Sequence, residues 1–475
     1  MSPHALVTAD STERTVDLSK FAVTKNAFLP DRSPSTILSD PYYEPWERVG
    51  QNLSSLIRHG TIRESIAQLP VLSTDRLQTE AEWRRAYTML AFMTHAYVWG
   101  GDKPEEVLPP SITIPFLRIA DHLELPPVLT YAAANLWNFS CSGHDFSNLE
   151  HLTTLFSFTG TESEAWFLLI SVAMEAKAAG ILQTMMAALE SVKERDYDAV
   201  TFALRELRAC IDGVSALLER MYEKCDPMVF YHQIRPFLAG SKNMEAAGLP
   251  RGVFYDEGDG KGEWRQLRGG SNGQSSLIQF FDVILGVEHH AHGGGNRNPN
   301  GHTNGHANGH ANGHANGHTH GHTHGHTHGH THGHTHDHTN ANGNSAAAPK
   351  SFLTEVRDYM PGPHRRFLVH AARMGSIREL ALVPPTTDEQ RRLRDAYSAA
   401  TDALSCFRDK HIQIVTRYII LPSKQAWNGP GRQNLASASS SKQAAGELTG
   451  TGGTMLVPFL KKTRDETSQA GRLMR

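Results

Sequence analysis

Two sets of histidines could carry chemistry in this chain of 475 residues. Eighteen of the 28 histidines lie between His289 and His338, mostly in a Gly-His-Thr-His repeat, and the other ten are scattered along the chain. Imidazoles two positions apart can chelate zinc, nickel or copper. A catalytic metal also needs a fixed geometry and hydrogen bonds that orient its ligands, which such a repeat does not provide. We therefore look for the catalytic histidine among the ten.

The repeat itself predicts a disordered insertion over residues 289–348. Glycine, asparagine, alanine and threonine offer too little apolar surface to offset the backbone entropy of ordering, roughly 1–2 kcal/mol per residue. Closure entropy grows only as about (3/2)RT ln n, so a folded protein tolerates such an insertion between two helices. Roughly a dozen positive charges would appear there as the pH falls from about 8 to about 6. A solvated spacer with incidental metal affinity and a selected metal-storing or pH-sensing element both remain possible.

His411 stands out among the scattered histidines. In the stretch "FRDKHIQIVTRYII" it shares one helix face with Ile414, Val415 and Tyr418, because these positions recur every three or four residues. One interpretation is a hydrogen-bonded core histidine. The other is an axial haem ligand, a neutral imidazole in a dry pocket that gives one nitrogen to iron.

The elements that must position these side chains are predicted to be helices, so the fold class is all-α. Apolar residues recur at helical spacing, and Thr161 and Glu164 have the spacing of a capping box. Proline and glycine interrupt the pattern at 108–116, 248–264 and 360–368. The main helical stretches are 157–192, 199–225, 275–287, 352–360 and 386–421. A Gly/Ser/Thr-rich stretch over 141–160 suggests a boundary, giving a leader at 1–35, a small helical domain at 36–156 and a large one at 157–475.

Composition excludes several classes of function. The net charge of −3 and the lack of a basic stripe argue against nucleic acid or an anionic membrane as partner. No run approaches ~18 apolar residues and the N-terminus lacks a secretion signal, so we expect a cytoplasmic protein. The four cysteines form no CxxC pair, which favours reduced thiols over a disulfide framework or zinc site.

Five segments, in this order, resemble the indoleamine 2,3-dioxygenases, and the fungal branch in particular. They are "DPMVFYHQIRPFLAG", "RGGSNGQSSLIQFFDVILGV", "VRDYMPGPHRRFL", "RDKHIQIVTRYII" and "GTGGT". The stretches "LPPVLTYAAANLW" and "WFLLISVAMEA" are similar to the helices of that family's distal pocket. The likeness extends from about Pro41 to the C-terminal end, without the histidine repeat.

The resemblance implies an enzyme with haem b in which ferrous iron binds O2. Both oxygen atoms are inserted across the C2–C3 bond of the indole of L-tryptophan, giving N-formylkynurenine. This is the first step of the kynurenine pathway, toward NAD synthesis or tryptophan catabolism. It further implies a small and a large helical domain that enclose the haem, and a monomer.

The resemblance also implies roles for particular residues. His411 corresponds to the proximal haem ligand, and Arg408 and Asp282 to a pair near a haem propionate. Catalytic roles fall to Ser171 and to Thr451 in a flexible Gly-Thr loop that closes over substrate. Substrate-binding roles fall to Tyr131, Phe167, Phe230, Tyr231, Arg235, Ser271, Asn272 and Thr451.

Residue chemistry agrees with these roles but leaves alternatives open. The two phenylalanines suit a flat indole, and the planar guanidinium of Arg235 suits a carboxylate. Arg235 could instead pair with a helix end, Phe230 could be ordinary core, Ser171 could bond back to a helix carbonyl, and "GTGGT" could be a linker. Tyr231 and Arg235, four apart, are expected on one side of a helix with Phe230 at its edge.

Three residues depart from the pattern of the animal enzymes. Tyr231 stands where a second phenylalanine is frequent, and Asn272 and Asn135 add polarity, which predicts a wetter pocket. On this basis Tyr231→Phe should change the Michaelis constant more than the maximal rate. No distal histidine or carboxylate motif presents itself as a general base, which leaves positioning and exclusion of water to the protein. Two other functions remain: a metal-buffering protein built on the histidine repeat, and a haem-binding sensor without efficient turnover.

Overall fold

The computed structural model describes residues 17–290, 351–429, 450–451 and 456–472. Nearly all of the predicted histidine-rich insertion and the first half of the predicted leader lie outside these residues. Helices dominate the described part, which confirms the all-α class. Residues 17–289 and 352–472 belong to one compact unit, and the predicted division at 156/157 stays a prediction. The helices are α1 (Glu44–Gln51), α2 (Leu53–His59), α3 (Ile62–Ala67), α4 (Glu80–Trp99), α5 (Pro110–His122), α6 (Glu162–Lys177), α7 (Ile181–Glu194), α8 (Tyr197–Glu219), α9 (Met221–Lys224), α10 (Pro227–Val229), α11 (Arg235–Leu238), α12 (Ser276–Leu285), α13 (Phe352–Glu355), α14 (Gly362–Met374), α15 (Ile377–Leu382), α16 (Asp388–Val415) and α18 (Leu456–Ala470).

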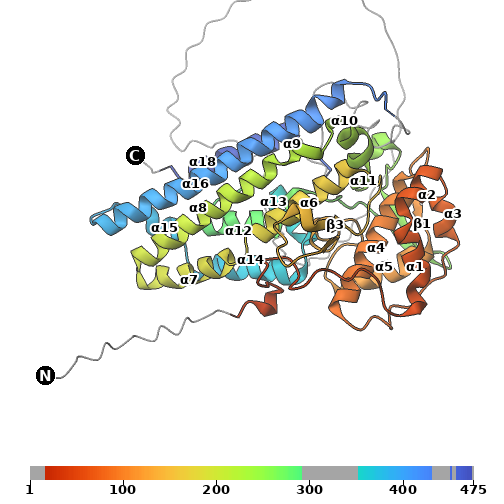
Figure 1. The fold of residues 1–475 in the computed structure, drawn as a ribbon, viewed down its shortest axis with the longest axis horizontal. Helices are drawn as coiled ribbons and strands as arrows, with labels where there is room; N and C mark the ends of the chain where they lie inside the picture. The colour runs from red at the N-terminus through yellow and green to blue at the C-terminus, as the bar shows by residue number, and fades with distance from the viewer. Residues whose placement is uncertain (1–16, 291–350, 430–449, 452–455, 473–475) are drawn as a thin grey trace, which may run out of the picture. The chain divides into compact units, whose positions relative to one another are not determined.

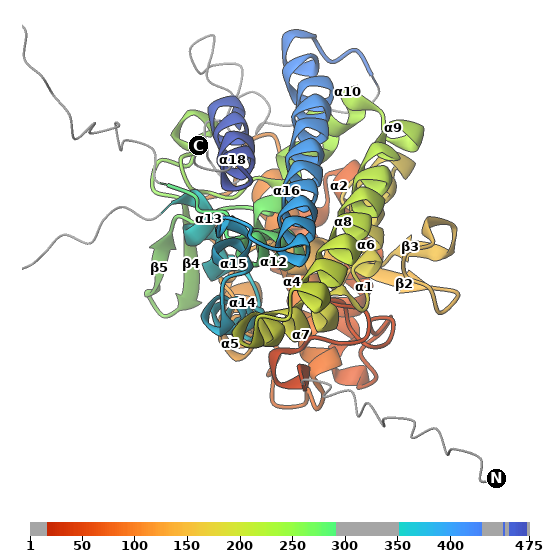
Figure 2. The same cartoon turned by 90° about the vertical axis from the view of Figure 1, so that its left-hand side faces the viewer.

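The longest helices, α8 and α16, pack side by side (Figures 1 and 2). Each begins where the sequence supplies a cap: Asp196 accepts a hydrogen bond from the backbone N–H of Ala199, and Thr387 and Gln390 form a reciprocal capping box. Apolar side chains at intervals of three and four bury the facing sides. The helix α18 packs along α16, and α7 and α6 along α8.

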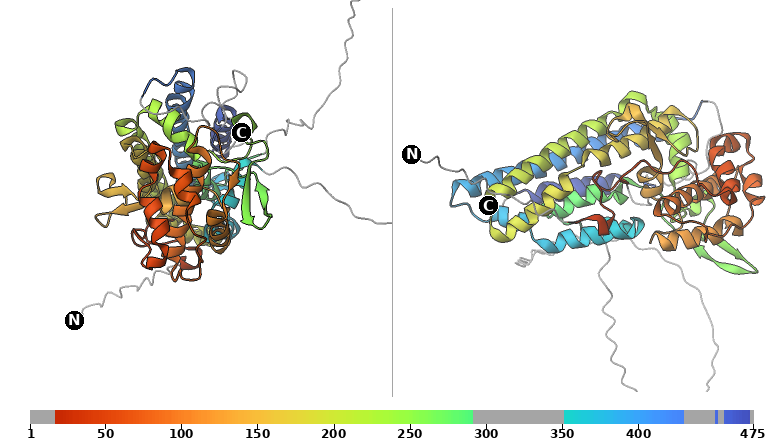
Figure 3. Two further views of the ribbon diagram at one scale, coloured as in Figure 1. Left: turned by 90° about the vertical axis from the view of Figure 1, so that its right-hand side faces the viewer. Right: turned by 60° about the horizontal axis from the view of Figure 1, so that its bottom comes forward.

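The N-terminal helices α1 to α5 gather at one end of these long helices (Figure 3). Among them α4 is buried along most of its length, and Thr79 and Glu82 begin it with a capping box. Its His95 accepts a hydrogen bond from the backbone N–H of Leu129 (3.1 Å) and donates one to the carbonyl of Phe237 (2.7 Å), so it is a satisfied core histidine. Burial lowers the pKa of His95 to about 4, which keeps it neutral.

A small sheet occupies the stretch 248–264, where the sequence predicted only interruptions. Strands β4 (Val253–Gly258) and β5 (Lys261–Arg265) form an antiparallel hairpin, and β1 (Val107–Leu108) pairs with β4 in parallel. The two residues between the paired Gly258 and Lys261, Asp259 and Gly260, both have positive φ (51° and 73°), as a tight hairpin turn requires. The other hairpin joins β2 (Phe139–Cys141) to β3 (Leu152–Thr154).

No single described helix is long and apolar enough to span a membrane; α6 and α7 pass on length and composition only as a pair, bent by 41°. All four cysteines are free, as their spacing predicted.

Candidate active site

A large cavity is lined by α6, α12, α16, α18 and the turns near residues 131, 230, 270 and 450. The space inside it that atoms do not fill is about 1860 Å³, including its open mouth. Most of the lining side chains are apolar. The predicted site residues on the wall are Tyr131, Phe167, Ser171, Phe230, Arg235, Ser271, Asn272, Asp282, Arg408, His411 and Thr451. Among the predicted site residues, Tyr231 alone is not on the wall.

Three π-helical segments contribute to the wall of this cavity. They are η3 (Ala132–Leu136), η5 (Phe230–Ile234) and η9 (Thr416–Ile420), and they supply Ala134 and Asn135, Phe230, and Tyr418 and Ile419 respectively. π-Helical turns are rare and frequently found at functional sites, because the extra residue redirects side chains. Their convergence on one cavity supports it as the functional site.

The segment η5 explains the position of Tyr231. A π turn carries i to i+5 hydrogen bonds, so Phe230 and Arg235, five positions apart, both reach the cavity. Tyr231 is rotated off the wall: it is 2% exposed, and its ring centroid lies 5.6 Å from the Arg235 guanidinium and 4.9 Å from the His232 ring. Tyr231 and Arg235 are therefore close together, as their spacing predicted, but Phe230 rather than Tyr231 shares the cavity wall with Arg235.

The helix α6 begins where the sequence predicted, with a modified cap. The Thr161 hydroxyl accepts a hydrogen bond from the backbone N–H of Glu164 (3.2 Å). The Glu164 carboxylate does not bond back to the N–H of Thr161. Instead it accepts from the backbone N–H groups of Phe158 (2.8 Å) and Thr159 (2.6 Å), which ties the preceding loop to the helix. This buried anchor fixes the start of a helix whose next three turns face the cavity.

Aromatic rings form one part of the wall. The rings of Phe167 from α6 and Phe230 from η5 meet edge to face with centroids 4.9 Å apart. The ring of Tyr418 from η9 meets Phe230 in the same way at 5.9 Å, and its hydroxyl donates to the carbonyls of Met221 and Cys225. Such a surface suits a flat apolar ligand. The buried guanidinium of Arg235 lies close enough to share the wall with these rings and adds a cation for an anionic group.

His411 lies on the wall with Ile414, Val415 and Tyr418, which confirms the predicted helix face. It is the cavity's lone histidine among the residues that the structure describes. Its ring has no hydrogen-bond partner within the described chain, unlike the core histidine His95. Burial, reinforced by the positive charge of Arg408, lowers the pKa of His411 to about 4. The imidazole is therefore neutral at pH 7 and free to bind a metal.

Arg408 and Asp282 form a buried ion pair one helical turn from His411. The Nη2 atom of Arg408 lies 2.7 and 2.8 Å from the two Asp282 carboxylate oxygens. Although burial opposes it, the charge of Arg408 helps to hold the pKa of Asp282 below its usual value. The pair therefore stays ionised, and its guanidinium borders the cavity beside His411.

Glu175 is a cavity residue to which the sequence reading gave no role. Its Oε1 accepts hydrogen bonds from the Tyr131 hydroxyl (3.0 Å) and the Ser275 hydroxyl (2.7 Å). Its Oε2 is buried without a partner in the described chain, and burial raises the pKa of Glu175 to about 7. One signal in the sequence could have found it, because Glu175 follows Phe167 and Ser171 at intervals of four on α6.

Two chain segments close another part of the wall. The Thr451 hydroxyl donates a hydrogen bond to the carbonyl oxygen of Gly270 (2.8 Å), next to Ser271 and Asn272. The Gln274 side chain accepts from the backbone N–H of Tyr131 (2.8 Å) and donates to Gly269 (2.9 Å), which fixes this turn to η3. Gly450 and Thr451 are the described residues of "GTGGT", and the remainder of the predicted lid lies outside them.

Fold and site together define an all-helical protein with a large, mostly apolar cavity and separate cations for anionic groups. Within the described residues, one histidine lies on its wall and has no hydrogen-bond partner. Comparisons with known proteins give the family. The family model described as indoleamine 2,3-dioxygenase matches residues 17–470. The chain belongs to the indoleamine 2,3-dioxygenase family and is an oxidoreductase of the dioxygenase class.

Relatives agree with this assignment. The chain is 36% identical to the indoleamine 2,3-dioxygenase nanC of Aspergillus nanangensis, over 96% of this chain and 98% of the relative. It is 37% identical to the indoleamine 2,3-dioxygenase of Saccharomyces cerevisiae, over 95% and 92%. It is 34% identical to the 6-hydroxytryptophan 2,3-dioxygenase fscD of Fusarium equiseti, over 93% and 95%. Enzymes of this family are haem-dependent and act on indoleamines with O2.

Proposed function

We propose that this chain binds haem b in the cavity, with His411 on the iron, and converts L-tryptophan to N-formylkynurenine at the first step of the kynurenine pathway. The observation that carries the proposal is the neutral imidazole of His411, which lies on the wall of a large, mostly apolar cavity and has no hydrogen-bond partner in the part of the chain that the structure describes. The ring of His411 is partly exposed to this cavity, so its nitrogen is accessible to a ligand. The neighbouring cation of Arg408 suits a haem propionate, so the residues present fit the cofactor.

Haem, when bound, would supply the iron that activates O2. The chain's own residues then bind and orient the substrate. The edge-to-face rings of Phe167 and Phe230 would hold the indole, and Arg235 would pair with the amino acid's carboxylate. Ser171 and Thr451 would offer hydroxyl contacts. With the substrate bound, the mostly apolar wall would limit the access of water, so positioning would carry much of the protein's contribution.

The test is anaerobic reduction of the haem-loaded protein, addition of L-tryptophan and air, and optical detection of N-formylkynurenine. His411→Ala should lose both the haem and the product, and His144→Gln, on an exposed histidine, should keep both. Haem binding without product from any indole would support the sensor alternative. Absence of haem binding by the wild type would overturn the proposal.

A second candidate substrate is a tryptophan hydroxylated on its indole ring. The side-chain amide of Asn135 donates to the carbonyl of Tyr131 (3.3 Å), but its Oδ1 is buried without a partner in the described chain. Because Asn135 belongs to the wall of the cavity, a ring hydroxyl is a donor that could satisfy it. The relative from Fusarium equiseti is named for 6-hydroxytryptophan, which supports the same candidate.

The Asn135 candidate predicts a change in selectivity. Asn135→Val should lower the ratio of kcat/KM for 5- or 6-hydroxytryptophan to that for L-tryptophan by about tenfold, since an unmade buried hydrogen bond costs ~1–3 kcal/mol. Asn272→Ala, a change elsewhere on the wall, should affect both substrates alike. An unchanged ratio in Asn135→Val, with turnover retained, would leave L-tryptophan as the better candidate.

A further inference from the structure

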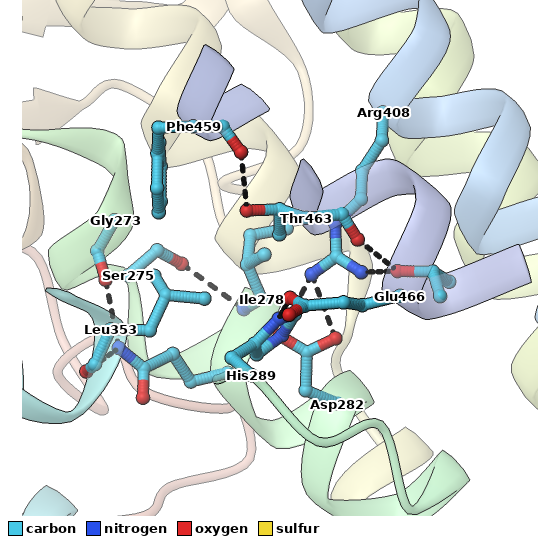
Figure 4. A network of polar contacts seen from close by, with 12 residues as sticks. Gly273, Ser275, Ile278, Asp282, His289, Leu353, Arg408, Phe459, Thr463 and Glu466 are labelled. Carbon is cyan, nitrogen blue, oxygen red and sulfur yellow. Dashed lines mark hydrogen bonds and ion pairs between the residues drawn. The ribbon is translucent and has the colours of Figure 1, made fainter. Parts of the chain in front are cut away.

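The sequence groups His289 with the histidine repeat, but the structure places it, half-buried, against Asp282 of the cavity wall. Its side chain is 11% exposed, and the residue lies shortly after the end of α12 in the chain. Figure 4 shows the ring between two carboxylates: Nε2 lies 3.1 Å from Oδ2 of Asp282, and Nδ1 lies 2.7 Å from Oε2 of Glu466. Asp282 belongs to α12 and Glu466 to α18. One imidazole therefore joins two helices that are far apart in the sequence.

The geometry determines the charge of this ring. Ionised carboxylates only accept hydrogen bonds, so both ring nitrogens of His289 must donate, and only the imidazolium has two N–H groups. Burial alone would lower the pKa of His289. The hydrogen bond and charge of Asp282 and the hydrogen bond to Glu466 nevertheless raise it above its ordinary value, against the opposing charge of Arg408.

The elements packed around the ring of His289 carry further charged groups. Arg408 on α16 pairs with Asp282 and also donates to the hydroxyl of Thr467 on α18. Lys462 on α18 lies 3.8 Å from Glu466. Arg357, in the segment η8 (Val356–Tyr359), interacts electrostatically with Asp282. Without the imidazolium, the carboxylates of Asp282 and Glu466 would face a neutral ring that can donate to only one of them.

The position of α18 matters to the cavity. Its residues Leu456, Phe459, Leu460 and Thr463 line the wall, and Glu466 and Thr467 lie one turn further along. The same helix begins shortly after Thr451, which contacts Gly270 at the wall. Arg408, which donates to Thr467 of α18, and its partner Asp282 also line the cavity.

We propose that His289 is a positioning residue whose imidazolium bridges Asp282 and Glu466 and thereby holds α18 against the cavity. The consequence for haem retention rests on the proposed function, whereas the consequence for α18 does not. A group whose pKa is raised on folding stabilises the fold below its unfolded pKa, and that stabilisation is lost as the pH rises through the folded pKa. The contact of α18 with the cavity should therefore loosen on the alkaline side.

The test measures two quantities in the haem-loaded full chain at about pH 6 and about pH 9: hydrogen exchange of the α18 amides, corrected for the intrinsic rate, and haem transfer to an excess of a scavenging apo-globin. In the wild type both should be about tenfold faster at the higher pH. His289→Gln should be fast at both values. His144→Gln, on an exposed histidine, should follow the wild type.

A second variant separates the proposal from a simple packing defect. Glu466→Gln removes one acceptor charge but keeps the shape, so the midpoint of the pH transition should move to lower pH. Wild-type protection of α18 at both pH values in His289→Gln, or an unmoved midpoint in Glu466→Gln, would overturn the proposal. If the chain takes up no haem, the proposed function fails, and the exchange of α18 amides still decides the role of His289.

Discussion

At the scale of single residues, Glu175 gives the clearest pH dependence. Its pKa rises from an ordinary value near 4.5 to about 7 because the carboxyl is buried. The folded state therefore holds a proton that the unfolded state releases. The associated stability is complete below about pH 4.5 and is lost as the pH rises through about 7, by roughly 3 kcal/mol in all.

Glu175→Gln should remove this loss. The variant should have nearly the same thermal midpoint as the wild type at about pH 5 and a higher midpoint at about pH 8, because the amide cannot ionise. Thermal unfolding across this range measures the difference. Glu162→Gln, on a carboxylate that is 72% exposed, is the matched control and should follow the wild type. Parallel curves for wild type and Glu175→Gln would contradict the assignment.

At the scale of elements, the π turn η5 changes the effect that we expect Tyr231→Phe to have on the Michaelis constant. The π turn directs Phe230 and Arg235 to the cavity and Tyr231 away from it. In addition, Tyr231→Phe keeps the aromatic ring that packs on the Arg235 guanidinium. Its Michaelis constant should therefore stay within about twofold of the wild type. Phe230→Leu removes an aromatic face from the wall and should raise the Michaelis constant about tenfold. Steady-state kinetics of both variants tests these expectations. A large effect of Tyr231→Phe would indicate that Tyr231 contacts the substrate.

At the scale of the whole molecule, the contacts of His289 with Asp282 and Glu466 change where the histidine-rich segment should be cut. Replacing residues 291–350 with a short Gly-Ser linker leaves His289 in place. Haem content and turnover should match the wild type, and the thermal midpoint should be equal or slightly higher, because a shorter loop costs less closure entropy. A deletion that starts at His289 should lose haem faster, as is expected of His289→Gln. Equal haem loss from both deletions would argue against this boundary.

The site could be predicted in part from the sequence. Helical spacing alone predicted that His411, Ile414, Val415 and Tyr418 share a face, and the structure confirms it. Capping residues predicted where α6 begins, since caps are local interactions between residues a few positions apart. The identity of the cavity residues came instead from the resemblance to a family, which periodicity cannot provide. Their roles remain proposals until the variants are measured.

The sequence by itself determined the all-helical class, the start of α6 and the helix face that carries His411, because these depend on local periodicity and capping. Tertiary structure alone decided three other features. Tyr231 in the π turn η5 lies off the cavity wall, and burial raises the pKa of Glu175 to about 7. Carboxylates from α12 and α18 bind His289, which the sequence grouped with the histidine repeat. The π turn departs from the regular spacing of an α-helix, and the pKa of Glu175 and the partners of His289 depend on burial and on residues far away along the chain. Local periodicity predicts none of these.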